Sequence, residues 1–381
     1  MRNKKLAIVG VGATPPAWSV DASVSRLVID AALAACEDAG IAPESIDGVL
    51  SEAYSTPKIM PELHAALNLK PEVFTANVGL VGSGAVATIS VAQAAAAAGL
   101  GSTFLCVYGL NLSQSEGPGS HHSADPYKAN MEMPFGFYPQ PIYMAAMTNR
   151  YLAQYGVDES LVAAVPIATR QWAALNPSAL RREPLTPEEY LASPVIADPL
   201  RKLDCCLISD GACAFVLTTR EVAADLRQPP VDILSVSRAV EPIPSQEYLG
   251  VRSDHMHLPS RLSGPSALKK AGLDVADVDL AYLYDCFSII PVLQLEDIGF
   301  CRAGEGLEFF ASGATAPGGA LPVNTHGGLL SHSYVPGLNM VVEAVTQLRR
   351  AADEARQQSA EVALVAAWAD TEHTTLILGR N

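Results

Sequence analysis

The sequence predicts an α/β protein made of two similar halves. Segments with the apolar composition of buried strands alternate with helical segments, and one helix–turn–strand unit occurs twice. A chain of 381 residues is long enough for two domains or for one large pseudo-symmetric domain. Strands that alternate with helices are typical of mixed sheets covered by helices. We therefore expect two such units, packed face to face.

The repeated unit is the main evidence for duplication. Residues 32–50 read ALAACEDAGIAPESIDGVL, and residues 266–283 read SALKKAGLDVADVDLAYL. Each segment has an amphipathic helix that ends in Ala-Gly-aliphatic, followed by a short acidic turn, an aliphatic–Asp pair and a strand. Gly40 and Gly272 stand at the helix C′ position, which favours glycine. A single match of this kind is compatible with chance, so the order of the other elements has to support it.

The other elements follow the same alternation. In the first half, two lysines lead directly into an apolar strand, a later strand runs into a Gly-rich turn and an Ala-rich helix, and glycines separate that helix from a buried strand. The strands of the first half are expected at 5–12, 74–78 and 103–108, and its helices at 23–39 and 83–98. The strands of the second half are expected at 231–237, 280–284 and 362–367, and its helices at 261–271, 289–298 and 335–350.

We place the N-terminal half at residues 1–225 and the C-terminal half at 226–381. The first half contains a long insertion at about 112–200, which is polar and rich in proline and has a helix of its own near 141–154. Structureless loops of this length are uncommon in compact domains. The insertion is therefore expected to be functional and not a disordered linker.

Composition and charge exclude several classes of function. The formal net charge of -15 argues against a surface that binds nucleic acid. The most apolar region, residues 84–110, is interrupted by Gln93, Gly99 and Gly101, so no membrane span is expected. No signal-peptide pattern follows the N-terminus, and the seven cysteines include no C-x-x-C pair. We expect a cytoplasmic protein without a metal site.

The turn before the Ala-rich helix is the first candidate site. Residues 77–87 read NVGLVGSGAVA, which places one side chain at a helix N-terminus, where partial positive charge favours an anion. A thiolate there would be a strong nucleophile. The side chain is instead that of Val81, which cannot attack a substrate. Ser83 stands two residues later and belongs to the turn.

Several motifs together resemble the thiolase superfamily, in its sterol-carrier (lipid-transfer) branch. The motifs are SDGACAFVL at 209–217, YDCF at 284–287, LEDIGFCRAGEG at 295–306 and GGALPVNTHGGLLS at 318–331. The likeness covers essentially the whole chain in the same order. It implies the thiolase fold, with duplicated halves in five layers (α-β-α-β-α), and a homodimer. It also implies an acyl-CoA thioester as substrate, with CoA as part of that substrate and no tightly bound cofactor.

The departures from the family pattern change the expected chemistry. Thiolases carry Cys where this chain has Val81, Asn or His where it has Tyr284, and His where it has Tyr334. A second Cys near the C-terminus is replaced within WADTEHT at 368–374. Two tyrosines and no Cys resemble the thiolase-fold aldolases that shorten steroid side chains. These aldolases are similar in needing a small accessory protein with a zinc ribbon and an OB-fold.

The resemblance places the two catalytic residues at Tyr284 and Tyr334. Retro-aldol cleavage takes a proton from a β-hydroxyl, breaks the Cα–Cβ bond and leaves a CoA enolate. We assign deprotonation to Tyr334 and stabilisation of the enolate to Tyr284. Four residues are candidates for supporting roles: Asp285, His326, His332 and His373. Five residues are expected to line the substrate pocket: Val81, Gly82, Ser83, Gly327 and Gly328.

Three functions follow from these observations. The first is a lyase that cleaves a β-hydroxyacyl-CoA, most naturally a steroid side-chain thioester, into a ketone and a shortened acyl-CoA of the propionyl-CoA type. The second is an acyltransferase of thiolase type, which the loss of Cys at position 81 disfavours. The third is a non-catalytic acyl-CoA- or lipid-binding subunit of a complex. Incubation with a β-hydroxyacyl-CoA distinguishes them by the appearance of a ketone.

Overall fold

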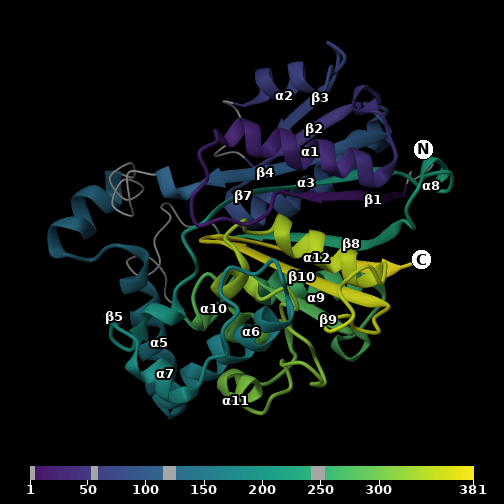
Figure 1. Ribbon diagram of the computed structural model, residues 1–381. Coiled ribbons are helices and arrows are strands. Elements are labelled where there is room, and N and C mark those ends of the chain that lie inside the picture. The colour runs from purple at the N-terminus through teal and green to yellow at the C-terminus, as the bar shows by residue number, and fades with distance from the viewer. Residues whose placement is uncertain (1–4, 53–58, 115–125, 242–253) are drawn as a thin grey trace.

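The computed structural model describes residues 5–52, 59–114, 126–241 and 254–381, and its main strands form two half-sheets joined along one seam (Figure 1). The strands, in chain order, are β1 (Leu6–Ala13), β2 (Gly48–Ser51), β3 (Phe74–Asn77), β4 (Thr103–Asn111), β7 (Asp210–Thr219), β8 (Val231–Val240), β9 (Leu280–Leu283), β10 (Val362–Ala369) and β11 (Glu372–Arg380). Two short strands, β5 (Val195–Ala197) and β6 (Leu200–Arg201), form a separate hairpin.

The two half-sheets share one strand order. The N-terminal half has the order β3-β2-β4-β7-β1, and the C-terminal half has β9-β10-β11-β8. In each half the pairs farthest from the seam are parallel, which are β3–β2 and β2–β4 in one half and β9–β10 in the other, and the pairs nearer the seam are antiparallel. A parallel bridge between Ala281 and Val323 occupies the position that corresponds to β3. The halves meet where β1 pairs with β8, through Ala7 and Ile8.

The helices form three further layers around the half-sheets. They are α1 (Val24–Ala39), α2 (Met60–Ala66), α3 (Val81–Ala98), α5 (Gln140–Tyr155), α6 (Ala164–Leu175), α7 (Pro187–Ala192), α8 (Arg220–Ala223), α9 (Ser260–Ala271), α10 (Ile289–Ile298), α11 (Gly306–Ala311) and α12 (Leu338–Leu348). Helix α1 covers the N-terminal half-sheet, and α9 and α10 cover the C-terminal one. Helices α3 and α12 each contact strands of both half-sheets and lie between them. The layers therefore run α-β-α-β-α, as the resemblance to the thiolase superfamily implies.

The repeated unit is confirmed at the level of single elements. Helix α1 ends at Gly40, with φ 72°, and is followed by a 3-10 turn at Pro43–Ser45 and by β2. Helix α9 ends at Gly272, with φ 72°, and is followed by a 3-10 turn at Val275–Asp277 and by β9. The residue spacing is identical in the two units. We propose the boundary at 225/226, which falls in the link between α8 and β8.

Helix α3 is apolar on all sides because it is enclosed by two sheets. Residues 82–89 are all buried, and most of the helix consists of Ala, Gly and Val. Small side chains let both half-sheets approach the helix axis, and a helix that is hydrophobic all round is a buried one. The start of α3 is therefore fixed between the halves, at the carboxyl ends of β2 and β3.

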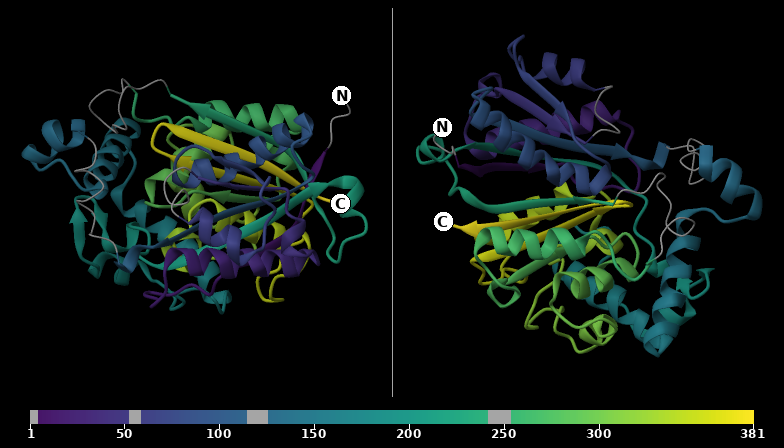
Figure 2. Two further views of the ribbon diagram at one scale, coloured as in Figure 1. Left: turned by 90° about the horizontal axis from the view of Figure 1, so that it is seen from above. Right: turned by 180° about the vertical axis from the view of Figure 1, so that it is seen from behind.

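The insertion lies at the end of the molecule opposite the marked chain ends, in all three views (Figures 1 and 2). The predicted helix near 141–154 is confirmed as α5. The insertion is bound to the C-terminal half by the buried carboxylate of Asp204, which accepts hydrogen bonds from Tyr190 at 2.8 Å and Ser288 at 2.7 Å.

Some predicted boundaries were wrong. Helix α3 begins at Val81, two residues earlier than expected, and α12 begins at Leu338 and not at 335. Strand β11 was not predicted, because its HTTLILG core directly follows the turn after β10 and was read as loop. In the part of the chain that the structure describes, we find no helix whose length and apolar character would let it cross a membrane.

Candidate active site

The start of α3 forms one wall of the candidate site. Strand β3 leads through Gly79, with φ 58°, to Val81, with φ 35°. A β-branched residue with positive φ is a genuine outlier, and such strain is found where the surrounding structure enforces it. The N–H groups of the first helical turn have no intrahelical acceptor and carry partial positive charge. The turn therefore keeps the geometry of an anion-binding helix start, although its side chain is inert.

Tyr284 and Tyr334 face each other at this helix start. Their hydroxyl oxygens are 3.4 Å apart and share a hydrogen bond. Tyr284 directly follows β9 and is 3% exposed, and its N–H donates to the carbonyl of Ala366 at 3.1 Å. The half-buried Tyr334 is held by its own N–H, which donates to Ser209 Oγ at 2.8 Å. Two residues separated by 50 positions thus present one pair of phenol groups.

Gly82 makes the close approach of α3 to this pair possible. A Cβ atom on Gly82 would lie 2.4 Å from Cε2 of Tyr284 and 3.0 Å from the carbonyl oxygen of Trp368. Gly337 of the C-terminal half contacts Gly82 itself, since a Cβ atom added to Gly337 would lie 2.5 Å from the carbonyl oxygen of Gly82. The ring of Tyr284 also packs edge-on against Trp368, with centroids 6.1 Å apart. Both halves of the chain therefore position Tyr284.

Burial keeps both phenols protonated. It raises the pKa of Tyr284 well above its ordinary value of 10.0, and the neighbouring Tyr334 adds to that shift. The pKa of Tyr334 is also raised well above 10.0, first by burial and then by nearby thiols, including that of Cys206. Neither phenol is a base in the resting site. Each can donate a hydrogen bond, and each can accept a proton only while passing its own proton on.

No side chain at the helix start replaces the missing thiolate. Ser83 is fully buried, and its hydroxyl is hydrogen-bonded to Thr374 Oγ1 at 2.9 Å. Cys286 is near Tyr334, but burial raises the pKa of its thiol well above 9.0, so it stays protonated. Among the residues that the structure describes, covalent catalysis of the thiolase type thus has no activated nucleophile at this helix start.

Asp285 points away from the tyrosine pair and supports the Gly-Gly segment. Its carboxylate accepts the N–H of Leu329 at 2.8 Å, at the start of the π-helical turn Gly328–His332. A Cβ on Gly328 would lie 1.9 Å from Asp285 Oδ2. Burial raises the pKa of Asp285 to about 7, against the effect of these N–H donors. Gly327 packs against Ala173 of α6. A place for the two glycines in the substrate pocket remains a prediction.

Two of the three candidate histidines, His326 and His373, are buried, and His332 is half-buried. His332 is hydrogen-bonded to Ser178 Oγ at 3.2 Å and to Ser333 Oγ at 2.8 Å. The ring of His326 lies 5.2 Å from that of His332, and burial lowers its pKa well below 6.5. His373 lies within β11, the strand that the sequence did not predict. There it is hydrogen-bonded to Ser263 of α9 at 2.6 Å, and burial lowers its pKa to about 3.

Charged residues that the sequence did not single out lie beside the Val81 turn. Glu372 forms an ion pair of 2.7 Å with Arg238, and its Oε2 also accepts the N–H of Leu80 at 3.4 Å. Glu52, which directly follows β2, is fully buried, and Tyr108 of the neighbouring strand β4 is 4% exposed. The only sequence signal for Glu52 is an acid at the end of an otherwise apolar strand.

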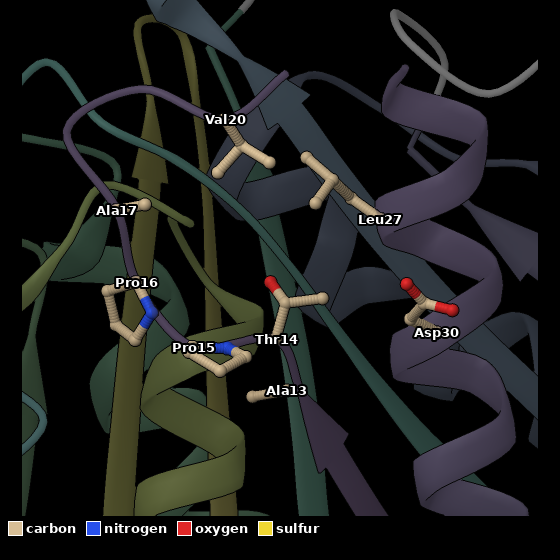
Figure 3. Close-up of a pocket in the computed structure, with 8 residues that line it drawn as sticks. All are labelled: Ala13, Thr14, Pro15, Pro16, Ala17, Val20, Leu27 and Asp30. Atoms are coloured by element: carbon tan, nitrogen blue, oxygen red, sulfur yellow. The ribbon is translucent and has the colours of Figure 1, made fainter. Parts of the chain in front are cut away.

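A surface pocket in the N-terminal half is a separate feature (Figure 3). It is formed by the segment that follows β1 and by Leu27 and Asp30 of α1, and neither tyrosine lines it. Its one ionisable side chain, Asp30, is paired with Arg26 at 2.9 Å. The pocket therefore has no pair of titratable groups that could transfer protons to and from a ligand.

Comparisons with known proteins agree with this geometry. A family model described as Thiolase C-terminal domain-like matches residues 244–380. The chain is 34% identical to 17-hydroxy-3-oxo-4-pregnene-20-carboxyl-CoA lyase of Mycobacterium tuberculosis, over 92% of each chain. It is 34% identical to the steroid side-chain-cleaving aldolase of Thermomonospora curvata, over 90% of each chain. The solved structure named Ltp2-ChsH2(DUF35) aldolase superposes with a TM-score of 0.88 and 31% identity, over 100% of this chain and 99% of that one.

Proposed function

Because the chain belongs to the thiolase-fold family of steroid side-chain-cleaving aldolases, we propose that it cleaves a steroid side-chain β-hydroxyacyl-CoA in the retro-aldol direction. The protein is a carbon–carbon lyase. The products are a ketone, which keeps the ring system, and a shortened acyl-CoA of the propionyl-CoA type. Coenzyme A enters and leaves as part of substrate and product.

The pair of tyrosine hydroxyls 3.4 Å apart is the observation on which this proposal rests. Both stand beside a helix start whose own side chain, Val81, cannot form an acyl-enzyme. A retro-aldol reaction needs one group at the β-hydroxyl and one at the thioester oxygen or α-carbon, and it needs no covalent intermediate. The pair supplies two such groups at one place.

We assign the groups by their position. Tyr334 receives the proton of the substrate β-hydroxyl while its own proton moves on, and the β-carbon becomes the ketone carbon. The electron pair of the Cα–Cβ bond moves into the thioester, which becomes an enolate. Tyr284 donates a hydrogen bond to the enolate oxygen, together with N–H groups of the first turn of α3. Protonation of the α-carbon then releases the shortened acyl-CoA.

The test uses Tyr284→Phe and Tyr334→Phe with a bulky β-hydroxyacyl-CoA, and the ketone and acyl-CoA products are followed by chromatography. Each variant should lower kcat by roughly 10²–10⁴-fold, the range for one positioned acid or base. The double variant should be little worse than the poorer single one if the hydroxyls act as a unit. Tyr282→Phe is the matched control, because that buried hydroxyl is bound to Thr325 at 3.0 Å. Wild-type turnover in both single variants would end this mechanism.

We also propose a DUF35-type accessory protein, of the zinc-ribbon and OB-fold kind, as a partner. The similar solved structure carries the name ChsH2(DUF35) beside Ltp2. The segment at the edge of the insertion exposes three large apolar side chains, Tyr127, Met131 and Phe135, with exposed fractions of 37%, 56% and 82%. Exposed apolar patches commonly mark binding surfaces. Co-elution with a DUF35-type protein should be weakened by Phe135→Ser and unaffected by Leu262→Ser, an equally simple change on α9.

A homodimer is proposed from the open edge of the N-terminal half-sheet. Strand β3 is the terminal strand of that half-sheet and pairs only with β2 among the described strands. An unpaired edge presents N–H and C=O groups to a second chain, and a two-fold axis would pair β3 with its own copy. Sedimentation analysis should give the mass of two chains, and a monomer at micromolar concentration would contradict the proposal. We also propose a cytoplasmic location, which the free state of all seven cysteines supports.

A further inference from the structure

We propose that Glu52 is the terminal proton acceptor of the reaction and that Tyr108 links it to the tyrosine pair. This inference rests on the proposed retro-aldol function and names two residues that complete its site. Glu52 does not contact the substrate in this scheme. It is a positioning residue, which acts on the proton through Tyr108 and the tyrosine pair. The argument depends on strand register, on the alternation of faces along the strands, on burial and on electrostatics.

Strand register places Glu52 beside Tyr108. Strand β2 pairs with β4 in parallel register as far as Ser51 and Val107, and the next residues on the two strands are Glu52 and Tyr108. On its other side, β2 pairs with β3 as far as Asn77, and the N–H of Val78 donates to Ser51 at 2.8 Å. Glu52 therefore stands at the carboxyl end of the half-sheet, between Tyr108 and the strand that leads to the Val81 turn.

The alternation of faces directs both side chains between the half-sheets. Side chains of a strand point alternately to its two faces. On β4, Leu105 and Val107 belong to the core under α1, whereas Phe104 and Tyr108 belong to the core between the half-sheets, which also contains Tyr284. On β2, Val49 faces α1 and Leu50 faces the inner core. Glu52, two residues after Leu50, continues the inner face, where it is fully buried.

Electrostatic interactions link Glu52 to Tyr108, and Tyr108 to the tyrosine pair. Burial is the main cause that raises the pKa of Tyr108 well above 10.0, and the charge of Glu52 adds to it. Tyr108 in turn contributes to the raised pKa values of Tyr284 and of Tyr334. Such interactions are stronger in a low dielectric than in water. A fully buried glutamate beside a buried phenol, which in turn acts on a pair of phenols with strongly raised pKa values, is an arrangement found at functional sites.

The reaction needs a group of this kind because the phenols are protonated. When Tyr334 takes the β-hydroxyl proton, its own proton passes to Tyr108, and that of Tyr108 passes to Glu52. One O–H bond of the substrate is broken and one O–H bond on Glu52 is formed. After the Cα–Cβ bond breaks, the proton returns through Tyr108 and Tyr284 to the α-carbon. Protons and electrons balance, and no co-reactant is required.

The test compares Glu52→Gln with the matched control Glu296→Gln. Glu296 is a half-buried glutamate bound to a tyrosine hydroxyl, that of Tyr151, in the contact between α5 and α10. Glu52→Gln should lower kcat by about 10²-fold or more, with KM changed by less than about threefold. Its residual kcat should rise with pH, because solvent hydroxide has to replace the carboxylate. Glu296→Gln should leave kcat and its pH profile at wild-type values.

The outcomes separate this inference from the proposed function. A wild-type enzyme without cleavage activity would contradict the function itself. An active wild type with a Glu52→Gln variant within about threefold of it, or with an equal loss in Glu296→Gln, would overturn the role of Glu52 alone. If Glu52→Gln does not fold, Tyr108→Phe decides, since it removes one hydroxyl only. It should lower kcat at unchanged KM, and wild-type turnover would overturn the relay.

Discussion

Gly82 is the position where a single methyl group should separate activity from folding. In Gly82→Ala the added Cβ would lie 2.4 Å from Cε2 of Tyr284, whereas carbon atoms in contact are about 3.5–4.0 Å apart. Either the ring or the start of α3 must therefore move by about 1 Å. The ring is confined by Trp368, so we expect both to move and the phenol pair to lose its alignment. Overpacking of this kind destabilises by roughly 1–3 kcal/mol. A displacement of about 1 Å at a reacting group lowers the rate on the order of 10²-fold.

The assay measures cleavage of a bulky β-hydroxyacyl-CoA and thermal unfolding of the same samples. Gly264→Ala is the matched control, because its Cβ would lie 2.7 Å from Ile298 Cγ1 in the layer of α9 and α10. Both variants should lose similar stability, but only Gly82→Ala should lose about 10²-fold in kcat. A folded Gly82→Ala enzyme with kcat within about threefold of wild type would refute the reasoning, because the tyrosine pair would then tolerate displacement.

Three further predictions concern the helix start and Asp285. Val81→Gly should raise the free energy of unfolding by on the order of 1 kcal/mol in thermal or urea unfolding, because glycine relieves the positive φ, and a loss would show that the turn is not strained. Val81→Cys should gain no thiolysis of a 3-ketoacyl-CoA, because Tyr284 and Tyr334 replace the residues that handle protons in thiolases and their protonated phenols do not activate a thiol, and measurable CoA-dependent cleavage would contradict this. Asp285 has a pKa of about 7 in the folded chain against about 3.9 unfolded, so its contribution to stability is lost as the pH rises from about 4 through about 7. Asp285→Asn should abolish that part of the pH dependence in urea unfolding, and an unchanged pH profile would refute the assignment.

The sequence was sufficient for the parts of the fold that depend on local patterns. The repeated Ala-Gly-aliphatic unit predicted two equivalent helix–strand elements, and the structure confirms both, with Gly40 and Gly272 in the left-handed region. The Gly-rich turn predicted a helix start, and α3 begins there. Tyr284 and Tyr334 were singled out because they replace catalytic positions of a family. Their hydroxyls do meet, although the assignment of base and acid stays a prediction.

The residues that the sequence could not reveal depend on contacts between distant segments. Glu52 and Tyr108 become neighbours only through the register of β2 and β4, which no local pattern encodes. The strand that contains His373 was not predicted, because the turn at Asp370 hid the apolar run that follows. In the structure His373 belongs to β11, and its ring is tied to α9 and α10. A single sequence gives no measure of such tertiary hydrogen bonds.

The meeting of Gly82 and Gly337 has a consequence for symmetry. Helices α3 and α12 are corresponding elements of the two halves, since each leads into the third strand from the seam, β4 and β10, and their starts touch across the pseudo-two-fold axis. An assembly of two identical half-length chains would have to present the same side chains at both helix starts. Fusion into one chain removes that constraint. One start can then carry an inert valine while the other is preceded by a tyrosine, so the active centre is built on broken symmetry.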